Sequence, residues 1–291
     1  MARSELESKM QFVERDIQWP RPWTAFATQQ WWEQLASYSH SILMLDYDGT
    51  LSPFVQDRME ATLYPGVGDR LFRLAQHPRV HLIFISGRPA TELASLLPSE
   101  LKAEIWGAHG CEHLLADGSM HVEPLTPAQT ASLGWLEDSI ANRGFRAAIE
   151  KKSGSLAFHT RSLTDDEGRQ LRELVHILFA QREAVAGPSA ELELLSFDGG
   201  IEVRGIGCSK AVAVARILQS EPGDAAAAYL GDDHTDEDAF RALDGRGLRV
   251  LVRDEARASL ADVWLRPPGE LLAFLDCWLM ALAAPLSGPR E

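Results

Sequence analysis

An apolar run that ends in two aspartates, Leu43 to Leu51 (LMLDYDGTL), constrains the fold of this chain more than any other segment. Residues Ile42–Leu45 are too few and too apolar for an independent helix and predict a buried strand. Such strands belong to parallel sheets covered on both faces, and these sheets place their ligands beyond the carboxyl ends of the strands. Asp46 and Asp48 are therefore expected at a ligand-binding edge.

The two aspartates have a specific chemistry at this place. Carboxylates so close together repel, and each raises the pKa of the other unless a cation lies between them. Mg²⁺ suits carboxylate oxygens, and a carboxylate held beside it can attack phosphorus while its neighbour passes a proton to the leaving oxygen. Gly49 permits a sharp turn and Thr50 adds a hydroxyl. The same D-x-D-G pattern also occurs in solvated turns, so that interpretation stays open for the motif alone.

The composition of the chain limits the classes of molecule that it can be expected to bind. The chain has 291 residues, 45% of them hydrophobic, and a net charge of −14. This charge argues against nucleic acid and against an anionic membrane surface, but not against a small anionic substrate beside a metal and a few lysines. Cys111, Cys208 and Cys277 are widely spaced and lack a C-x-x-C pair, which predicts a reduced protein with no disulfide framework and no zinc site.

The two ends of the sequence favour a soluble protein. The first sixteen residues are charged and contain no apolar run, so we expect no signal peptide. The apolar segment Leu271–Leu286 is interrupted by Asp276 and is shorter than the ~20 residues that span a bilayer, which predicts a helix packed on the sheet. We expect a cytoplasmic monomer.

Apolar strands alternate with helical segments along most of the chain, which predicts an α/β fold with a doubly wound parallel-sheet (Rossmann-like) core. The expected core strands are Ile42–Leu45, Val80–Ile85, Ile105–Gly107, Ala226–Leu230, Leu248–Leu251 and Val263–Leu265. The expected helices between them are Gly68–Gln76, Thr91–Leu96, Lys210–Leu218 and Thr235–Leu243.

The middle third has a different pattern, in which short β-like runs are interleaved with two helical stretches and separated by turn signals. These elements are His113–Leu115, Thr126–Asn142, Phe145–Lys151, Ser155–His159, Thr164–Gln181, Leu192–Phe197 and Gly200–Val203. They predict a small antiparallel sheet backed by two helices, inserted into the core as an α+β cap. We therefore divide the chain into a leader (1–38), a catalytic core (39–112 and 205–291) and a cap (113–204).

The leader contains four tryptophans, at positions 19, 23, 31 and 32. A helix or arm that packs on the core is the simpler interpretation. Binding of a partner is the alternative, and the sequence does not decide between them.

Three further segments place polar groups at the ends of predicted elements. Ser86-Gly87-Arg88 follows a buried strand, where a hydroxyl and exposed N–H groups can hold a phosphate oxygen. Lys210 begins a helix and can neutralise a phosphate, although an exposed lysine is the commoner outcome. Asp232 and Asp233 follow another strand and are candidate metal ligands, while the acidic residues that come next also suit a helix start.

The ordered set of these motifs resembles the haloacid-dehalogenase-like phosphohydrolases over nearly all the chain after residue 40. Within that superfamily it is similar to the trehalose-6-phosphate phosphatases. The segments that carry this closer likeness are Asp46–Pro53, Pro65, Ser86–Arg88, Gly107–Gly110, Ile149–Arg161, Glu202–Arg204, Lys210 and Gly231–Asp236.

The resemblance implies a Mg²⁺-dependent phosphatase that converts trehalose 6-phosphate to trehalose through an aspartyl-phosphate. It implies Asp46 as the nucleophile, Asp48 as the general acid and base, and Mg²⁺ held by Asp46, Asp48 (through its carbonyl) and Asp232, supported by Asp233 and Asp236. Phosphate would be held by Thr50, Ser86, Gly87 and Lys210. Substrate contacts would come from Arg88, His109, Glu150, Lys152, Arg161 and Glu202.

Two alternatives remain open at this point. The core motifs are shared with capped phosphatases that act on sucrose phosphate or mannosyl-phosphoglycerate. The second alternative is a regulator that binds a sugar phosphate without catalysis, although the acidic and phosphate-binding positions are intact.

Overall fold

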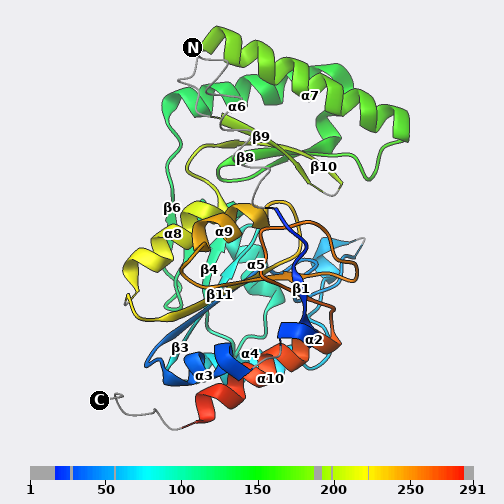
Figure 1. The fold of residues 1–291 in the computed structure, drawn as a ribbon. Helices are drawn as coiled ribbons and strands as arrows, with labels where there is room; N and C mark the ends of the chain where they lie inside the picture. The colour runs from blue at the N-terminus through cyan, green and yellow to red at the C-terminus, as the bar shows by residue number, and fades with distance from the viewer. Residues whose placement is uncertain are drawn as a thin grey trace, which may run out of the picture.

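The computed structural model describes residues 17–26, 29–55, 57–186, 192–197, 199–221 and 223–284. In this part the chain forms a larger core lobe and a smaller cap lobe (Figure 1). The core is built on a mostly parallel sheet and the cap on an antiparallel one, so the predicted α/β fold with an inserted α+β cap is confirmed.

Among the described residues, nine strands form the core sheet in the order β1-β13-β12-β11-β2-β3-β4-β5-β6. Neighbours from β1 to β4 in this order are parallel, and β5 and β6 are added antiparallel. Every residue of β2 and of β11 is buried, as expected of apolar strands covered on both faces. The strands are β1 (Arg21–Pro22), β2 (Ser41–Leu45), β3 (Val80–Ile85), β4 (Glu104–Gly107), β5 (Glu112–Leu114), β6 (Met120–Val122), β11 (Ala226–Gly231), β12 (Leu248–Val252) and β13 (Val263–Leu265).

Helices cover both faces of this sheet. On one face, α3, α4, α5 and α10 contribute to a single apolar cluster, and on the other α8 and α9 build a second. In α4 the buried residues Val67, Leu71 and Leu74 recur at helical spacing, which forms the stripe that packs on the strands. The core helices are α2 (Trp23–Phe26), α3 (Gln29–Ser37), α4 (Val67–Ala75), α5 (Ala90–Leu96), α8 (Lys210–Ser220), α9 (Asp236–Leu243) and α10 (Gly269–Ala283), with short 3₁₀ turns η1 (Arg58–Glu60) and η2 (Ala108–Gly110).

The strand order reverses between β2 and β11. From β2 the chain proceeds through β3 to β4 on one side, and from β11 through β12 to β13 on the other. A crevice opens at such a switch point, outside the carboxyl ends of the two strands. The segments after Leu45 and after Gly231 border this crevice.

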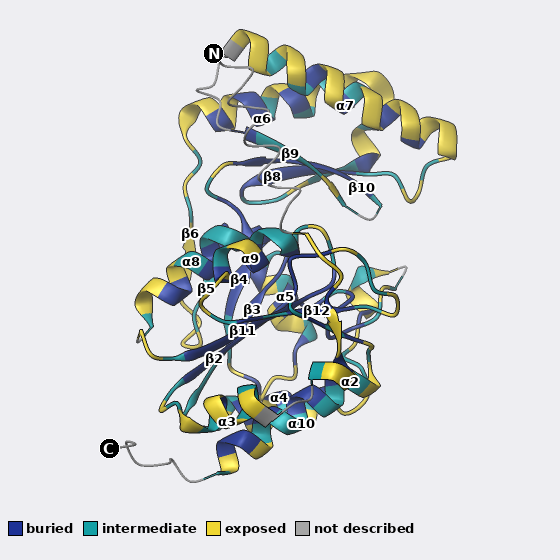
Figure 2. Cartoon of the chain, viewed as in Figure 1, coloured by how far each residue is buried: buried dark blue, intermediate teal, exposed yellow. Residues whose placement is uncertain are grey.

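The cap sheet has the antiparallel order β7-β8-β10-β9. Helices α6 and α7 cover the face turned away from the core, and the opposite face is directed at the core lobe (Figures 1 and 2). The cap elements are α6 (Pro127–Ile140), the turns η3 (Ala141–Phe145) and η4 (Arg146–Ala148), β7 (Ile149–Lys151), β8 (Ser155–His159), α7 (Asp165–Ala186), β9 (Leu192–Phe197) and β10 (Gly200–Gly205).

Two strands that lie mostly or wholly in the range predicted for the cap, β5 and β6, belong to the core sheet instead. The sequence places His113–Leu115 among the cap strands, whereas β5 pairs with β4 and so extends the core sheet. The register joins Ile105 to Leu114 and Gly107 to Glu112, because the chain reverses directly after β4. A three-residue strand carries no sequence signal for its partner, so its position depends on this local reversal.

Three of the four leader tryptophans pack on the core, in agreement with the simpler interpretation, whereas Trp19 is 71% exposed. Rings of Trp23, Trp31 and Trp32 contact α10, with Trp32 5.3 Å from Phe274 and Trp31 5.4 Å from Trp278 between ring centroids. Residues 1–16 and 27–28 lie outside the described residues, as do the last two residues of the predicted C-terminal helix. Across the described helices, none combines the length and apolarity that crossing a membrane requires.

Candidate functional site

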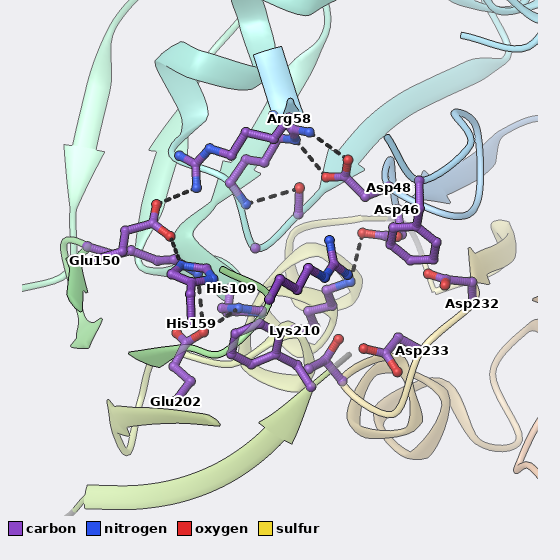
Figure 3. Close-up of a pocket in the computed structure, with 18 of the residues that line it drawn as sticks. Asp46, Asp48, Arg58, His109, Glu150, His159, Glu202, Lys210, Asp232 and Asp233 are labelled. Atoms are coloured by element: carbon purple, nitrogen blue, oxygen red, sulfur yellow. Dashed lines mark hydrogen bonds and ion pairs between the residues drawn. The ribbon is translucent and has the colours of Figure 1, made fainter. Parts of the chain in front are cut away.

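Polar side chains follow four neighbouring parallel strands at the points where these strands end. Asp46 follows β2, Ser86 follows β3, His109 lies just beyond β4, and Asp232 follows β11. Because the carboxyl ends of parallel strands meet at one edge of the sheet, the four side chains converge on a single cleft beneath the cap (Figure 3).

Asp46 is almost completely buried at the floor of this cleft. The residue is 4% exposed, its Oδ1 lies 2.8 Å from Nζ of Lys210, and its Oδ2 accepts a 3.3 Å hydrogen bond from the Thr50 hydroxyl. Burial raises the pKa of Asp46 to about 7, with Lys210 acting against the increase. A buried carboxylate directed at an ammonium group is suited to nucleophilic attack on an anionic centre.

Asp236 holds the Lys210 side chain in place through a buried ion pair. The Lys210 ammonium lies 2.7 Å from Oδ1 of Asp236, which also accepts a 2.6 Å hydrogen bond from the Tyr229 hydroxyl. The other Asp236 oxygen accepts from the N–H groups of Asp232 and Asp233, each at 2.9 Å. Burial opposes the charge on Lys210, but the neighbouring carboxylates raise its pKa above the ordinary value, so the lysine is held protonated.

The carboxylates at the switch point fit a hard cation. Oxygen atoms of Asp46, Asp232 and Asp236 lie within 4.8 Å of one another. Burial first, and then the charges of the neighbouring aspartates, raise the pKa of Asp232 well above its ordinary value. Gly49 makes the approach possible, since a Cβ there would lie 2.3 Å from Oδ2 of Asp232. With Asp236 committed to Lys210, the side chains of Asp46 and Asp232 remain for a divalent cation.

Arg88 holds Asp48 in place. Its Nε and Nη2 atoms each lie 2.6 Å from an oxygen of Asp48, and its Nη1 lies 2.7 Å from Glu92. Arg88 is predicted to contact the substrate, but in this structure its guanidinium is directed at the aspartate. The backbone N–H of Arg88 donates to Oγ of Ser86 at 3.1 Å, which orients that hydroxyl at the strand end.

His109 connects the core to the cap. The backbone of His109 is in the left-handed region (φ 57°). The His109 ring packs so closely on Gly87 that a Cβ added to Gly87 would lie 2.7 Å from the ring. The Nε2 atom of His109 lies 3.4 Å from Glu202, a buried residue of the cap strand β10. Gly87 therefore gives the histidine room to reach the cap.

The cap contributes a charged face to the cleft. Glu202 accepts a hydrogen bond from the Ser155 hydroxyl and lies 3.2 Å from Nζ of Lys152. Beside this pair, Glu150 lies 2.7 Å from Nε2 of His159. These side chains come from β7, β8, β10 and the turn between β7 and β8, so the antiparallel sheet sets their spacing.

Arg58 is a functional candidate that the sequence motifs miss. It belongs to η1, between β2 and α4, and its guanidinium bonds to Glu150 of the cap and Glu92 of the core. It therefore joins the two lobes at the rim of the cleft (Figure 3). The contact spans 92 positions of sequence, so the local pattern around Arg58 gives no sign of it.

The structure brings the predicted site residues together. All line the cleft except Thr50 and Asp236, which are buried beneath Asp46 and Lys210. Arg161 reaches the cleft from the cap, 5.9 Å from the Phe54 ring centroid. The lining residues outside the predicted set are Phe54, Val55, Arg58, His159, Phe197 and Thr235.

The prediction of no disulfide is wrong for one pair. Cys111 and Cys208 form a disulfide, although 97 positions separate them. The turn after β4 and the segment before α8 meet under the cap, and Gly154 lies so close that a Cβ there would be 2.1 Å from Sγ of Cys111. Spacing along the sequence cannot reveal a pair that only the tertiary fold brings together. Cys277 is free.

Comparison with known proteins gives consistent matches. The trehalose-phosphatase family profile matches residues 44–259. A Mycobacterium avium trehalose-phosphate phosphatase is 30% identical over 81% of this chain and 61% of its own length, and a Dictyostelium discoideum alpha,alpha-trehalose-phosphate synthase (UDP-forming) B is 31% identical over 69% and 25%. A solved Aspergillus fumigatus trehalose-6-phosphate phosphatase has 25% identity and a TM-score of 0.65, covering 86% of this chain and 96% of that one.

The doubly wound core, the inserted cap and the aspartates at the switch point define a capped protein of the haloacid-dehalogenase-like superfamily. The family match extends over the core motifs and the whole cap. The chain belongs to the trehalose-phosphatase family. It spans about a quarter to three-fifths of the length of the two curated relatives described above.

Proposed function

We propose that this chain hydrolyses trehalose 6-phosphate to trehalose and inorganic phosphate, with Mg²⁺ as cofactor and a phosphorylated Asp46 as intermediate. The observation that carries the proposal is the 2.8 Å contact between Asp46 and Lys210 at the floor of a cleft whose opposite wall is the charged cap face. Membership of the trehalose-phosphatase family supports the choice of substrate.

In the first step, a carboxylate oxygen of Asp46 attacks phosphorus as the bond from phosphorus to the sugar oxygen breaks. Asp48 donates its proton to the departing oxygen, so trehalose leaves as a neutral alcohol. Lys210 and the Ser86 hydroxyl contact the phosphoryl oxygens and offset their charge. Phosphoryl transfer depends mainly on such positioning and charge neutralisation, which agrees with a site built from fixed ionic contacts.

In the second step, water attacks the phosphorus of the acyl phosphate and Asp48 accepts its proton. The bond from phosphorus to the Asp46 oxygen breaks, which releases inorganic phosphate and restores the carboxylate. Asp48 thus alternates between its acid and carboxylate forms, and Arg88 keeps its side chain oriented because Nε and Nη2 each lie 2.6 Å from one of its oxygens.

The residues that would hold Mg²⁺ are Asp46, Asp232 and the backbone carbonyl of Asp48, with Asp233 and Asp236 in support. When bound, the cation would supply positive charge beside the phosphoryl group. Without it, two buried carboxylates face each other and the pKa of Asp232 is raised. A divalent cation removes this repulsion, which is why the donor set fits.

The cap would select the sugar. A disaccharide presents many hydroxyl groups, and the cap face offers both acceptors and donors to them. Closure of the cap over the bound sugar would exclude water during the first step. The residues proposed for these contacts are Glu150, Lys152, Arg161 and Glu202 of the cap, together with His109 of the core.

The direct test is phosphate release from trehalose 6-phosphate by the full chain, with Mg²⁺ or with a chelator. We expect turnover only with the metal, and none in Asp46→Asn, because the amide cannot act as the nucleophile. Asp166→Asn, on the exposed surface of α7, is the matched control and should retain full activity. Substantial activity in Asp46→Asn would assign the nucleophile elsewhere, and binding of the sugar phosphate without any release would identify a silent regulator.

A further inference from the structure

A second group of metal-ligating side chains lies at the opposite edge of the core sheet. His40 precedes β2, His81 is the second residue of β3, and Glu221 follows the end of α8. One ligand atom from each lies within 4.8 Å of the others. His40 and Asp46 are six positions apart at the two ends of β2, which corresponds to about 20 Å of extended chain. This cluster is therefore distinct from the cleft beneath the cap.

The contacts within the cluster converge on the Glu221 carboxylate. Nδ1 of His81 contacts one oxygen, and Nε2 of His40 lies 2.7 Å from the other. The His40 nitrogen is buried and, among the described residues, has no partner in hydrogen-bonding geometry. A buried imidazole nitrogen with no hydrogen bond is available to ligate a cation.

The outer contacts support the same interpretation. The second ring nitrogen of His81, Nε2, lies 2.8 Å from Oε2 of Glu104. A carboxylate behind a ligating histidine fixes the ring and its tautomer at metal sites. Glu104 is itself held in place, because its Oε1 lies 2.7 Å from both Nε2 of His113 and Nε1 of Trp106.

We propose that His40, His81 and Glu221 form a site for a divalent transition-metal ion, with Zn²⁺ as the best match. Two imidazole nitrogens and one carboxylate are a donor set that Zn²⁺ takes readily, with a further position left for water. Mg²⁺ prefers oxygen ligands, so the two edges of the sheet would select different cations. The site uses no cysteine, which is why the cysteine spacing in the sequence gives no indication of it.

Solvent can reach the site. The side chains of His40 and His81 are 28% and 33% exposed, and a pocket lined by Tyr38, Ala225 and Glu221 opens beside them. Arg246 also lines this pocket, but its guanidinium donates to the Leu218 carbonyl at 2.9 Å. A bound ion would join the starts of β2 and β3 to the end of α8, three segments far apart in sequence.

The test is a Zn²⁺ titration of the untagged full chain at about pH 8, because a metal ion must displace protons from its histidine ligands and binds more readily at higher pH. Saturating Mg²⁺ is present throughout to occupy the cleft, and binding is measured by competition with a chromogenic zinc chelator. We expect one Zn²⁺ per chain and a rise in Tm of about 5 °C at a hundredfold excess over Kd.

Variants assign the ion to its ligands. His81→Gln and His40→Gln should each weaken Zn²⁺ binding by roughly 100-fold or more, and Glu104→Gln by about 10-fold to 100-fold. His176→Gln, which replaces an exposed histidine of α7, is the control and should bind as the wild type does. Circular dichroism and Tm in the presence of a chelator establish that each variant is folded. If His81→Gln does not fold, His40→Gln is the variant that tests the site.

Two results would overturn the proposal. One is equal Zn²⁺ affinity in the wild type, His40→Gln and His81→Gln. The other is binding that survives these changes but is lost in Asp232→Asn, which would place the ion in the cleft.

Discussion

The Nζ atom of Lys210 lies 2.8 Å from Oδ1 of Asp46, although 164 positions separate the two residues in the sequence. The whole cap is inserted between them, and Lys210 begins α8 soon after the chain returns to the core. The insertion therefore leaves the charge pair of the core intact while it places a second charged surface above it.

Replacement of Lys210 by methionine tests this pair. The change removes the cation but keeps most of the side-chain volume, so Asp46 and Asp236 are left buried without their counter-charge. We expect kcat to fall by about 100-fold or more, and the free energy of unfolding by about 3–5 kcal/mol. Enzyme kinetics and urea unfolding measure the two effects. Lys102→Met, at an exposed position, is the control and should change neither quantity. If Lys210→Met kept the kcat of the wild type, Lys210 would have no part in the mechanism.

Asp232 tests the proposed Mg²⁺ site. Because the cation would separate two buried carboxylates, added Mg²⁺ should raise the Tm of the wild type, and a chelator should reverse the change. In Asp232→Asn this Mg²⁺-dependent increase should disappear together with turnover. Asp244→Asn, whose side chain is 71% exposed, is the control. An undiminished Mg²⁺ effect in Asp232→Asn would contradict the ligand assignment.

Lys152 tests sugar recognition by the cap. It lies 3.2 Å from Glu202 on the face that lines the cleft, whereas its neighbour Lys151 is 71% exposed. Loss of a charged hydrogen bond should lower kcat/KM for trehalose 6-phosphate by about 10-fold to 100-fold in Lys152→Ala. Hydrolysis of a small aryl phosphate should change much less, and Lys151→Ala should resemble the wild type. Equal losses on both substrates would assign Lys152 to the phosphate end of the cleft.

Glu150 should make the stability of the folded protein depend on pH. Burial opposes its ionisation, but His159, Lys152 and Arg58 lower its pKa from 4.5 to about 2. A carboxyl group whose pKa falls on folding stabilises the protein above the unfolded value and loses this contribution as the pH falls through the folded one. The stability difference between the wild type and Glu150→Gln should therefore be largest above about pH 5 and shrink towards pH 2.

Urea unfolding at several pH values measures that difference. Glu183→Gln, at an exposed position of α7, should show no such trend. A difference that is constant from about pH 6 to pH 2 would mean that His159, Lys152 and Arg58 do not stabilise the ionised form of Glu150 in the folded protein.

The sequence predicts well what depends on local pattern. The strand ends at Asp46, Ser86 and Asp232 follow from short apolar runs, and the structure brings all three to one edge of the sheet. The fold class follows from the alternation of these runs with helical segments. Even the cap helices lie within a few residues of their expected bounds, because their apolar spacing and turn signals are local.

What the sequence misses depends on contacts between distant segments. Arg58 meets Glu150 only because the cap is positioned over the core, and Cys111 meets Cys208 only where the chain leaves η2 and returns to α8. The partner of β5 is decided in the same way. Arg88 shows a further limit, since its position beside the cleft is predictable but the direction of its guanidinium towards Asp48 is not.

The most direct measurement of the central claim is kcat/KM for phosphate release, with Mg²⁺, from trehalose 6-phosphate, sucrose 6-phosphate, mannosyl-phosphoglycerate and glucose 6-phosphate. We expect a clear preference for trehalose 6-phosphate, because the core supplies the chemistry and the cap selects the sugar. Faster turnover of sucrose 6-phosphate or mannosyl-phosphoglycerate would contradict the assignment of the cap, and no release from any of the four would contradict the proposed activity itself.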